Sequence, residues 1–428
     1  MAVGIANTVK AALLFKPVAG TLATGVLTTD AYNATSQSFT NPAAVLWNSG
    51  QLNTQGQKWE AVNGGDPTAG CRNVATPRTV GDARFNHVTE FEFLFTGGAL
   101  DIQFIAGSYY DCQVYVEWGG RMHKAQAAPI TGTTSGLMNR RLVFATPFHG
   151  RIRVHLAGGL FVGINCEQSA IIKKSPDRLF GICDGSDWVD GKGLVQGSGT
   201  SYLTAGLLDY LFERTGIVWA RRAQSGTGFF CNGATTVADD SAASDNSTRW
   251  FSQSRKDWMA ADLAADLPTK PLFFLLVGTQ VDGGRSSATG SSTGPMATLE
   301  LACLQWIRGL DQFCTIAHIS PSPYTGAGSA GSLTGPPTAG NGHDLNRQEQ
   351  AAAIAKVPRA AYINAFGPTL PWFTGTGGNG TPATSQQATL IGADGLNFAA
   401  LGAAFYAGKI AAELGQLSVN LARSRGQQ

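Results

Sequence analysis

The chain has 428 residues, of which 43% are hydrophobic and 14% are charged, and its formal net charge is +2. This length is enough for two domains with full cores. The small net charge and the lack of any Lys/Arg run argue against a nucleic-acid partner. No segment approaches the roughly 20 apolar residues of a membrane span. Low charge and abundant Gly, Ala, Ser and Thr fit an extracellular or particle-bound protein better than a cytosolic enzyme.

Residues 1–35 are rich in Ala, Thr and Gly, and they predict an N-terminal arm or an irregular first strand. Two alternatives are open for an arm of this kind, docking on a neighbouring subunit or a loose tail. The first residues lack a basic segment, and the apolar run Ala11–Phe15 is too short for a secretory signal. We therefore expect an extracellular or virion-associated protein without a standard signal peptide.

Residues 36–170 have the pattern of an antiparallel β-sandwich, with a jelly roll as the expected form. Apolar and polar residues alternate in five segments separated by Gly-rich turns, at 91–95, 100–105, 112–118, 151–156 and 160–164. Trp47, Trp59 and Trp118 fall in this part. They suit a sugar-binding face, as in a lectin-like module, but packing within the sheets is the more common role of such side chains.

Residues 178–428 predict a parallel three-layer α/β domain, because short apolar runs alternate with helical patterns. Continuous apolar runs are typical of strands buried on both faces. The expected strands are 179–183, 217–220, 272–277, 313–319 and 361–365, and the expected helices are 202–215, 296–310, 347–356 and 398–414. Chemistry in such sheets lies at the carboxyl ends of the strands.

The seven cysteines are scattered and include no CxxC pair. Neither a disulfide framework nor a zinc site is indicated, and no phosphate loop or dinucleotide fingerprint is present. We expect no metal and no cofactor, and most cysteines are expected to be small buried residues.

Four segments suited to acyl chemistry occur in order at the expected sheet edge: Cys183–Gly191 (CDGSDWVDG), Ala223–Phe229 (AQSGTGF), Gly278–Gly283 (GTQVDG) and Asp394–Asn397 (DGLN). This order resembles the SGNH (GDSL-type) hydrolases, especially two-domain carbohydrate esterases with a β-sandwich ahead of the catalytic domain. The resemblance covers roughly residues 178–414, and for the sandwich it is one of architecture only.

In that family the serine of Gly-Asp-Ser is the nucleophile, and its backbone N–H forms part of the oxyanion hole. In the first segment, Asp184 matches the family aspartate when aligned from the strand, and Gly185 then falls on the nucleophile. Alignment backward from Gly191 places Asp187 there instead. Ser186 lies between them, so an inserted residue lets it serve as nucleophile; otherwise it is a serine in a turn. Trp188 of this segment is expected to contact substrate.

The second and third segments imply the oxyanion donors. Gly226, in the Gly-Thr-Gly variant of the second block, is implied as a backbone donor. Gln280 stands where the family has asparagine, and it keeps an amide donor on a longer arm, with loop capping as the alternative. Asp282 is expected to contact substrate.

The fourth segment keeps the orienting Asp394 but has Asn397 where the family has its histidine base. An amide does not remove a proton from a nucleophile at neutral pH. His318 and His343 are the histidines of this domain that are placed to substitute, although each is more often a packing or loop residue.

Three departures at one sheet edge favour a pseudoenzyme, an SGNH-like protein with inactive or impaired catalysis. It would be a structural or glycan-contacting part of an extracellular assembly, such as the tail or head surface of a phage virion, with itself or other virion proteins as partners. The alternatives are an active carbohydrate acetyl esterase acting on a surface polysaccharide and a lectin-like binding module.

Overall fold

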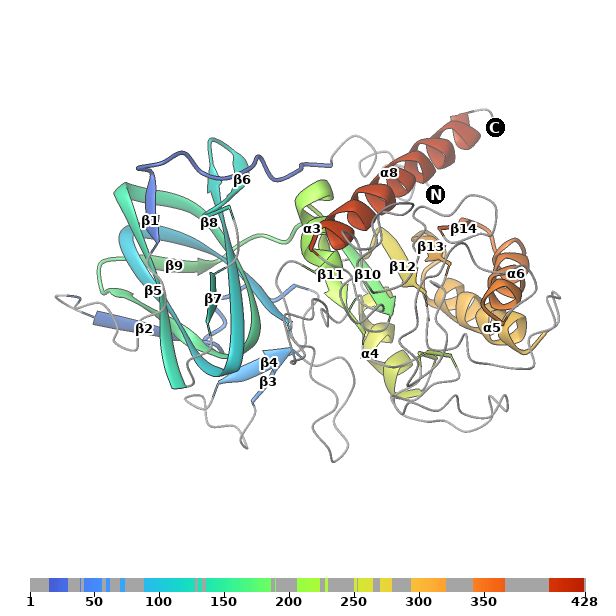
Figure 1. Cartoon of the computed structure of the whole chain (residues 1–428), viewed down its shortest axis with the longest axis horizontal. Helices are drawn as coiled ribbons and strands as arrows, with labels where there is room; N and C mark the ends of the chain where they lie inside the picture. Colours follow the sequence, from blue (N-terminus) through green and yellow to red (C-terminus); the bar gives the residue numbers. More distant parts are fainter. Residues whose placement is uncertain are drawn as a thin grey trace, which may run out of the picture.

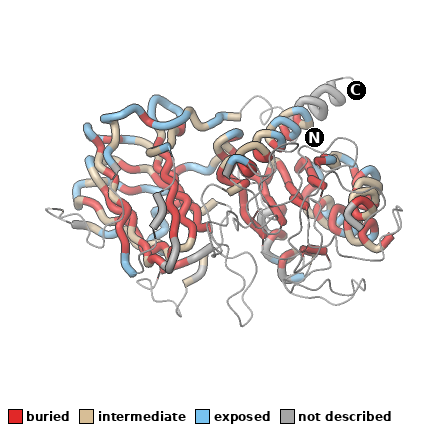
Figure 2. The backbone as a smooth tube through the Cα atoms, viewed as in Figure 1, coloured by how far each residue is buried: buried red, intermediate tan, exposed pale blue. Residues whose placement is uncertain are grey.

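The computed structural model describes residues 15–29, 39, 42–55, 59–61, 70–73, 88–127, 130–132, 136–185, 189, 206–223, 228–229, 250–251, 253–264, 270–278, 294–320, 342–365 and 400–426. Within them, one antiparallel β-domain lies beside one α/β domain (Figure 1). Buried residues form the core of the β-domain and, separately, the core on each face of the sheet in the α/β domain (Figure 2).

The antiparallel domain is built around two long strands, β5 (Val88–Trp118) and β8 (Gly136–Glu167), each of which runs through both sheets of the sandwich (Figure 1). The pairing gives one sheet the order 42–46, 159–167, 99–106 and 136–143, and the other the order 88–97, 148–157, 111–118 and 121–124. Successive segments of β5 and of β8 thus alternate between the two sheets, whereas 111–118 and 121–124 are neighbours in one sheet. The predicted antiparallel sandwich is confirmed.

Shorter strands complete the two sheets. They are β1 (Leu27–Thr29), β2 (Pro42–Leu46), β3 (Trp59–Ala61), β4 (Cys71–Asn73), β6 (Arg121–Lys124), β7 (Ile130–Gly132) and β9 (Ile171–Lys174). β1 and β9 pair with β8 and β5, although both lie outside the predicted 36–170. The period-two pattern placed its apolar side chains in one core, because inward and outward positions alternate along each strand.

The α/β domain contains a parallel sheet in the order β11-β10-β12-β13-β14. Its strands are β10 (Phe180–Gly185), β11 (Val218–Arg221), β12 (Phe273–Val277), β13 (Thr315–Ile319) and β14 (Ala360–Ile363). All neighbouring pairs are parallel. The five predicted strands agree with these to within two residues at each end. This is the doubly wound order 2-1-3-4-5, whose topological switch point lies between β10 and β12.

Helices cover both faces of this sheet, which gives the three predicted layers (Figure 1). They are α3 (Leu207–Thr215), α4 (Gln253–Ala264), α5 (Pro295–Leu310), α6 (Gly342–Ile354) and α8 (Ala400–Gly426). Side chains of α3 and α8 share one core with the sheet, and those of α4 and α5 share the other. None of the described helices has the length and apolar character to cross a membrane.

Helix α4 has no counterpart among the predicted elements. Its core contacts come from Met259 and Leu263, four residues apart on one face. The surrounding Gln, Ser, Arg, Lys and Asp residues give the segment a weak apolar pattern, so its helical period does not stand out in the sequence.

Residues 15–22 of the N-terminal segment form hydrogen bonds with other parts of the same chain. The N–H groups of Lys16 and Val18 donate to the carbonyls of Thr215 and Glu213, at 3.0 and 2.8 Å. These carbonyls belong to the last turn of α3, where helix carbonyls lack partners within the helix. Further along, the N–H of Ala19 donates to the carbonyl of Met122 in β6 at 2.8 Å. The described part of the arm is therefore a strap across both domains.

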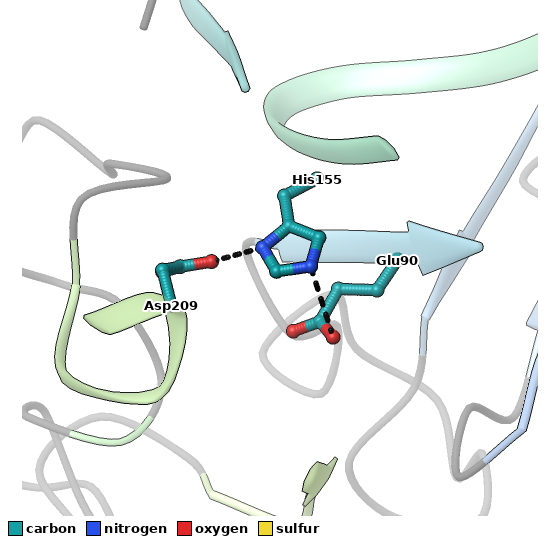
Figure 3. Close-up of side chains that lie close together, drawn as sticks. All are labelled: Glu90, His155 and Asp209. Carbon is teal, nitrogen blue, oxygen red and sulfur yellow. Dashed lines mark hydrogen bonds and ion pairs between the residues drawn. The ribbon is translucent and has the colours of Figure 1, made fainter. Parts of the chain in front are cut away.

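Helix α3 also carries the main polar contacts between the domains. Asp209 Oδ1 lies 2.5 Å from Nδ1 of His155 in β8, and Glu213 accepts a hydrogen bond from the Tyr115 hydroxyl at 3.1 Å. Arg221 at the end of β11 reaches Glu90 of β5, with Nη2 and Oε1 2.9 Å apart. Figure 3 shows Glu90 and Asp209 on opposite sides of the imidazole. The interface is thus a buried network of charges.

Candidate functional site

The carboxyl edge of the parallel sheet brings together the beginnings of three of the four sequence segments. Asp184 and Gly185 end β10, Ala223 lies two residues after β11, and Gly278 follows β12. The N–H of Gly278 donates to the carbonyl of Ile319 at 3.1 Å, which holds the β12 end against β13. The switch point of the sheet therefore lies beside Asp184, as expected for a ligand site in this topology.

Asp184 is buried and paired with a helix side chain. Its Oδ1 accepts hydrogen bonds from Nη1 of Arg255 in α4 and from the N–H of Gly185, both at 2.8 Å. Burial raises the pKa of Asp184 to about 6, although Arg255, the Gly185 N–H and Arg222 each act to lower it. The carboxyl group therefore titrates at about pH 6, and it holds the N–H of Gly185, the last residue of β10.

Position 185 has no room for a side chain. A Cβ added to Gly185 would lie 2.5 Å from Cγ2 of Val189 and 3.2 Å from the carbonyl oxygen of Val277. Val189 is itself fully buried and short, so it cannot swing away. The alignment that places the nucleophile at 185 therefore has no steric space for one, and Ser186 stays the hydroxyl candidate of this segment of the sequence.

Gly185→Ala is expected to lower the free energy of unfolding by about 1–3 kcal/mol, because the extra methyl group overpacks a closed site. Gly98→Ala is the matched control, since a Cβ at Gly98 would meet nothing within 4 Å. Denaturant unfolding of the two variants measures the difference. Equal stabilities would mean that the end of β10 has room for a side chain at position 185.

Seven of the candidate site residues lie outside the described residues, namely Ser186, Trp188, Gly226, Gln280, Asp282, Asp394 and Asn397. The backbone of His343 lies in the first turn of α6, and its side chain is not described. Of the second segment, Phe229 packs on Trp250 with ring centroids 5.4 Å apart. The catalytic roles of these residues remain predictions from the sequence.

His318 is in the core. In the register of the sheet, His318 of β13 pairs with Leu276 of β12, and Leu276 pairs with Asp184 of β10. The ring has no exposed surface, and its Nδ1 lies 2.7 Å from Oε1 of Glu300 in α5. Trp250 and Tyr362 pack around it, with ring centroids 6.2 and 5.7 Å away. Strands lie about 4.8 Å apart, so two strand spacings, about 10 Å, separate the backbones of His318 and Asp184.

Arg255 and Glu300 are functional candidates that the sequence analysis missed. Both come from helices on the same face of the sheet, and both are buried. The signal available in the sequence was a charge within a helical apolar stripe: Arg255 precedes Met259 and Leu263 at intervals of four residues. Without the fold, such a charge is indistinguishable from one on a solvated helix face.

The sandwich tryptophans do not form a shared face. Trp59 packs edge-on against Phe91 and Phe161, each with ring centroids 5.6 Å apart, and Trp47 packs on the same core. Trp118 is 41% exposed and stacks on Phe148. Packing therefore accounts for Trp47 and Trp59, and Trp118 alone of the three presents a large open ring surface.

Glu90, His155 and Asp209 are the described cluster with metal-ligand geometry, since their ligand atoms lie within 4.8 Å of one another (Figure 3). Two guanidinium groups occupy the same space: Arg153 Nη2 lies 2.6 Å from Glu90 Oε2, and Arg221 Nη2 lies 2.9 Å from Glu90 Oε1. Arg153 Nε also donates to His155 Nε2 at 2.8 Å. The Glu90 carboxylate is thus already paired with two arginine side chains, and this cluster does not fit a metal site.

Buried cysteines match the sequence expectation. The six described cysteines are buried and unbonded to one another: Cys71, Cys112, Cys166, Cys183, Cys303 and Cys314. Burial raises the pKa of each thiol, for instance to about 12 at Cys112 and at Cys314. A raised pKa suppresses the reactive thiolate, so these side chains suit packing rather than catalysis.

No protein-family model and no curated protein sequence matches the chain. Among solved structures, a carbohydrate esterase whose active site is described as having divergent catalytic and non-catalytic binding functions matches with a TM-score of 0.50 at 12% identity. The match covers 85% of this chain and 96% of that one. Similar structures also include an active-site mutant of a family two carbohydrate esterase from Clostridium thermocellum, with TM-score 0.47, 13% identity and coverage of 88% and 98%.

An acetyl xylan esterase from the rumen bacterium Butyrivibrio proteoclasticus matches with TM-score 0.43, 12% identity and coverage of 88% and 98%. Of these three structures, the first alone reaches a TM-score of 0.50, and at such identity it is evidence for the fold. Both parts of the chain are included in that match, in agreement with the observed sandwich and parallel sheet. The chain therefore has a fold similar to that of this carbohydrate esterase: an antiparallel β-sandwich precedes a three-layer α/β domain, which is the arrangement expected from the resemblance to the SGNH (GDSL-type) hydrolases.

Proposed function

We propose that this protein is an SGNH-fold pseudoenzyme that contacts a glycan and hydrolyses esters poorly or not at all. The observation that carries the proposal is the burial of His318, the candidate replacement base whose side chain the structure describes. A general base must come within about 3 Å of the proton that it removes. His318 instead has its Nδ1 held by Glu300 within the core, and the sequence offers the amide of Asn397 where the family has imidazole.

The proposal includes a setting and an organisation. Low charge and the Gly/Ser/Thr-rich composition support a component of an extracellular assembly, such as a phage tail or head surface, with other copies or other virion proteins as partners. We propose an N-terminal segment at 1–35, a sandwich at 36–170 and an α/β domain at 178–428. The strap formed by residues 15–22 is consistent with a segment that ties the two domains together.

A second candidate is an active carbohydrate acetyl esterase. The observation in its favour is the tight packing of Asp184 and Gly185 at the end of β10, the strand that Ser186 directly follows in the sequence. In that mechanism the Ser186 hydroxyl attacks the ester carbonyl and gives its proton to His343, with Gly226 and Gln280 as the oxyanion donors and Asp394 as the orienting carboxylate. The sugar hydroxyl leaves with that proton, and water then releases acetate from Ser186.

Hydrolysis of a chromogenic acetyl ester separates the two candidates. We expect the wild-type protein to turn over no faster than Ser186→Ala. We expect Asn397→His to raise turnover by about 100-fold or more, because general base catalysis contributes at least that much. His318→Gln is the control that should leave the rate unchanged. Wild-type turnover that disappears in Ser186→Ala would establish the esterase and overturn the pseudoenzyme.

Glycan contact needs a separate measurement. Calorimetric titration with an acetylated xylo-oligosaccharide is expected to show binding without release of acetate. Loss of binding in Trp118→Ala would support a lectin-like role for the sandwich, and retained binding would exclude the Trp118 ring as the contact. Lack of binding to a panel of acetylated and unmodified glycans would count against glycan contact altogether.

A further inference from the structure

A cavity of about 420 Å³ lies between the N-terminal strap and the sandwich, away from the carboxyl edge of the parallel sheet. Nine described residues line it: Phe15, Lys16, Pro17, Glu117, Gly120, Arg121, Met122, Arg151 and Arg178. They come from three places, namely the strap, the turn between β5 and β6 with its flanks, and the connection between the domains. Its size lies within the range of small-molecule sites.

The cavity has an excess of positive charge. Arg151 and Arg178 are held by acidic side chains, since Arg151 Nη1 lies 2.7 Å from Glu92 Oε1 and Arg178 Nε lies 2.6 Å from Glu92 Oε2. Lys16 and Arg121 have no ion-pair partner in the part of the chain that the structure describes. Lys16 and Arg121 are both exposed, and they line the open side of the cavity with no carboxylate of the described residues paired to them.

The arginines of the wall are rigidly placed. Glu92 is itself buried, and burial raises its pKa, but Arg178, Arg153 and Arg151 outweigh burial and lower it, so this carboxylate stays charged. It also accepts a hydrogen bond from the Ser175 hydroxyl at 2.9 Å. The terminal nitrogens of Arg178 have no acceptor among the described residues. A guanidinium fixed by one nitrogen and free at the others is well suited to bind a planar carboxylate with two bonds.

The remaining wall suits the body of a sugar acid. Phe15, Pro17 and Met122 offer an apolar surface, and Glu117 offers an acceptor for hydroxyl groups. Because Glu117 would repel a dianion, the lining favours a ligand with one negative charge and several hydroxyl groups.

We infer that this cavity binds a carboxylate-bearing saccharide unit, such as a hexuronic acid residue. The choice of a saccharide rests on the proposed glycan contact, whereas the requirement for an anion rests on the cavity itself. The site is separate from the candidate catalytic edge and lies where the strap, the sandwich and the interdomain connection meet.

Calorimetric titration of the full chain with glucuronate, glucose and inorganic phosphate tests the inference. We expect glucuronate to bind with an affinity that falls as salt is raised, and glucose and phosphate to bind at least about 10-fold more weakly. Arg121→Gln is expected to weaken glucuronate binding about 10-fold, equivalent to one lost charge-assisted hydrogen bond. Lys173→Gln, an exposed cation of β9 outside the cavity, is the matched control and should bind like the wild type.

Three results would overturn the inference: no binding of glucuronate, equal binding of glucose, or binding of phosphate as tight as that of glucuronate. Equal losses in Arg121→Gln and Lys173→Gln would also overturn it, since binding would then be a non-specific charge effect. The acetyl-ester assay is independent of these arms. Ester turnover together with glucuronate binding would refute the pseudoenzyme proposal and keep the cavity site. No glucuronate binding together with no ester turnover would refute the cavity site and keep the pseudoenzyme proposal.

Discussion

Glu90→Gln is expected to lower the free energy of unfolding by about 3–5 kcal/mol at pH 7, the loss typical of breaking a buried ion pair by removing one partner. Glu90 joins two cations, Arg153 at 2.6 Å and Arg221 at 2.9 Å, and all three side chains are buried. The substitution keeps the shape and removes the charge, so the two guanidinium groups lose their shared counter-charge. Denaturant unfolding followed by tryptophan fluorescence measures the loss.

Glu117→Gln on the same strand is the matched control. Its carboxylate is partly exposed and lies 3.4 Å from Arg151, so an effect below about 1 kcal/mol is expected. The double variant Glu90→Gln/Arg221→Met is expected to regain part of the stability, because it removes one of the unmatched buried charges. A Glu90→Gln effect no larger than the control would show that the interdomain network contributes nothing measurable.

The pKa of Glu90 predicts how the free energy of unfolding depends on pH. Burial alone raises the pKa of Glu90, but His155, Arg221 and Arg153 together lower it from 4.5 to about 2. A carboxyl group with a lowered folded-state pKa stabilises the fold above about pH 4.5, and this contribution is lost as the pH falls from 4.5 toward 2. The gap in stability between wild type and Glu90→Gln should therefore narrow by about 3 kcal/mol across that window. A constant gap would contradict the assignment.

Arg255→Leu is expected to lower the free energy of unfolding by about 3–5 kcal/mol at pH 8, with a smaller loss at pH 5. Arg255 is the cation that contacts Asp184, and burial already raises the pKa of that carboxyl group to about 6. Without the guanidinium the pKa rises further. A raised folded-state pKa means that the stabilisation is present at low pH and is lost as the pH rises from 3.8 through the folded value. Each further unit of pKa adds about 1.4 kcal/mol to the difference between the two conditions.

Lys256→Leu, the neighbouring position of α4, serves as the control. Its ammonium lies 4.6 Å from the centre of the Phe251 ring at a partly exposed position, and we expect a loss of about 1 kcal/mol or less at either pH. Unfolding curves at pH 5 and pH 8 provide the comparison. If the Arg255→Leu loss is the same at both values, the buried Asp184 carboxyl is not what Arg255 stabilises.

Much of the α/β domain was predictable because its signals are local. The run Phe273–Val277 is buried along its whole length, as expected of a strand covered on both faces. Such runs require helices on both sides, and parallel strands require crossovers, so the fold class follows from the alternation of strand and helix patterns, whereas the strand order comes from the structure. Helix α4 was not predicted, because its sequence has no strong helical period of apolar residues.

The candidate site was predictable only in part. The position of Asp184 at the end of β10 followed from the strand before it. Its partner Arg255 is 71 residues away, and a single sequence contains no distance between them. His318 shows the same limit: its place near the end of β13 suggested an edge residue, but side chains alternate between the two faces of a strand, and this ring is directed to the buried α5 side.

By itself, the sequence determined the strands of the parallel sheet, their alternation with helices and the presence of Asn397 where the family has a base, because each depends on residues close together in the chain. Only the tertiary structure decided that Gly185 is closed to a side chain, that His318 is sealed by Glu300, and that charges 131 residues apart, Glu90 and Arg221, meet between the domains. Steric exclusion and buried ion pairs depend on what the fold brings into contact. The sequence pattern of a buried charge is the same as that of a charge in water.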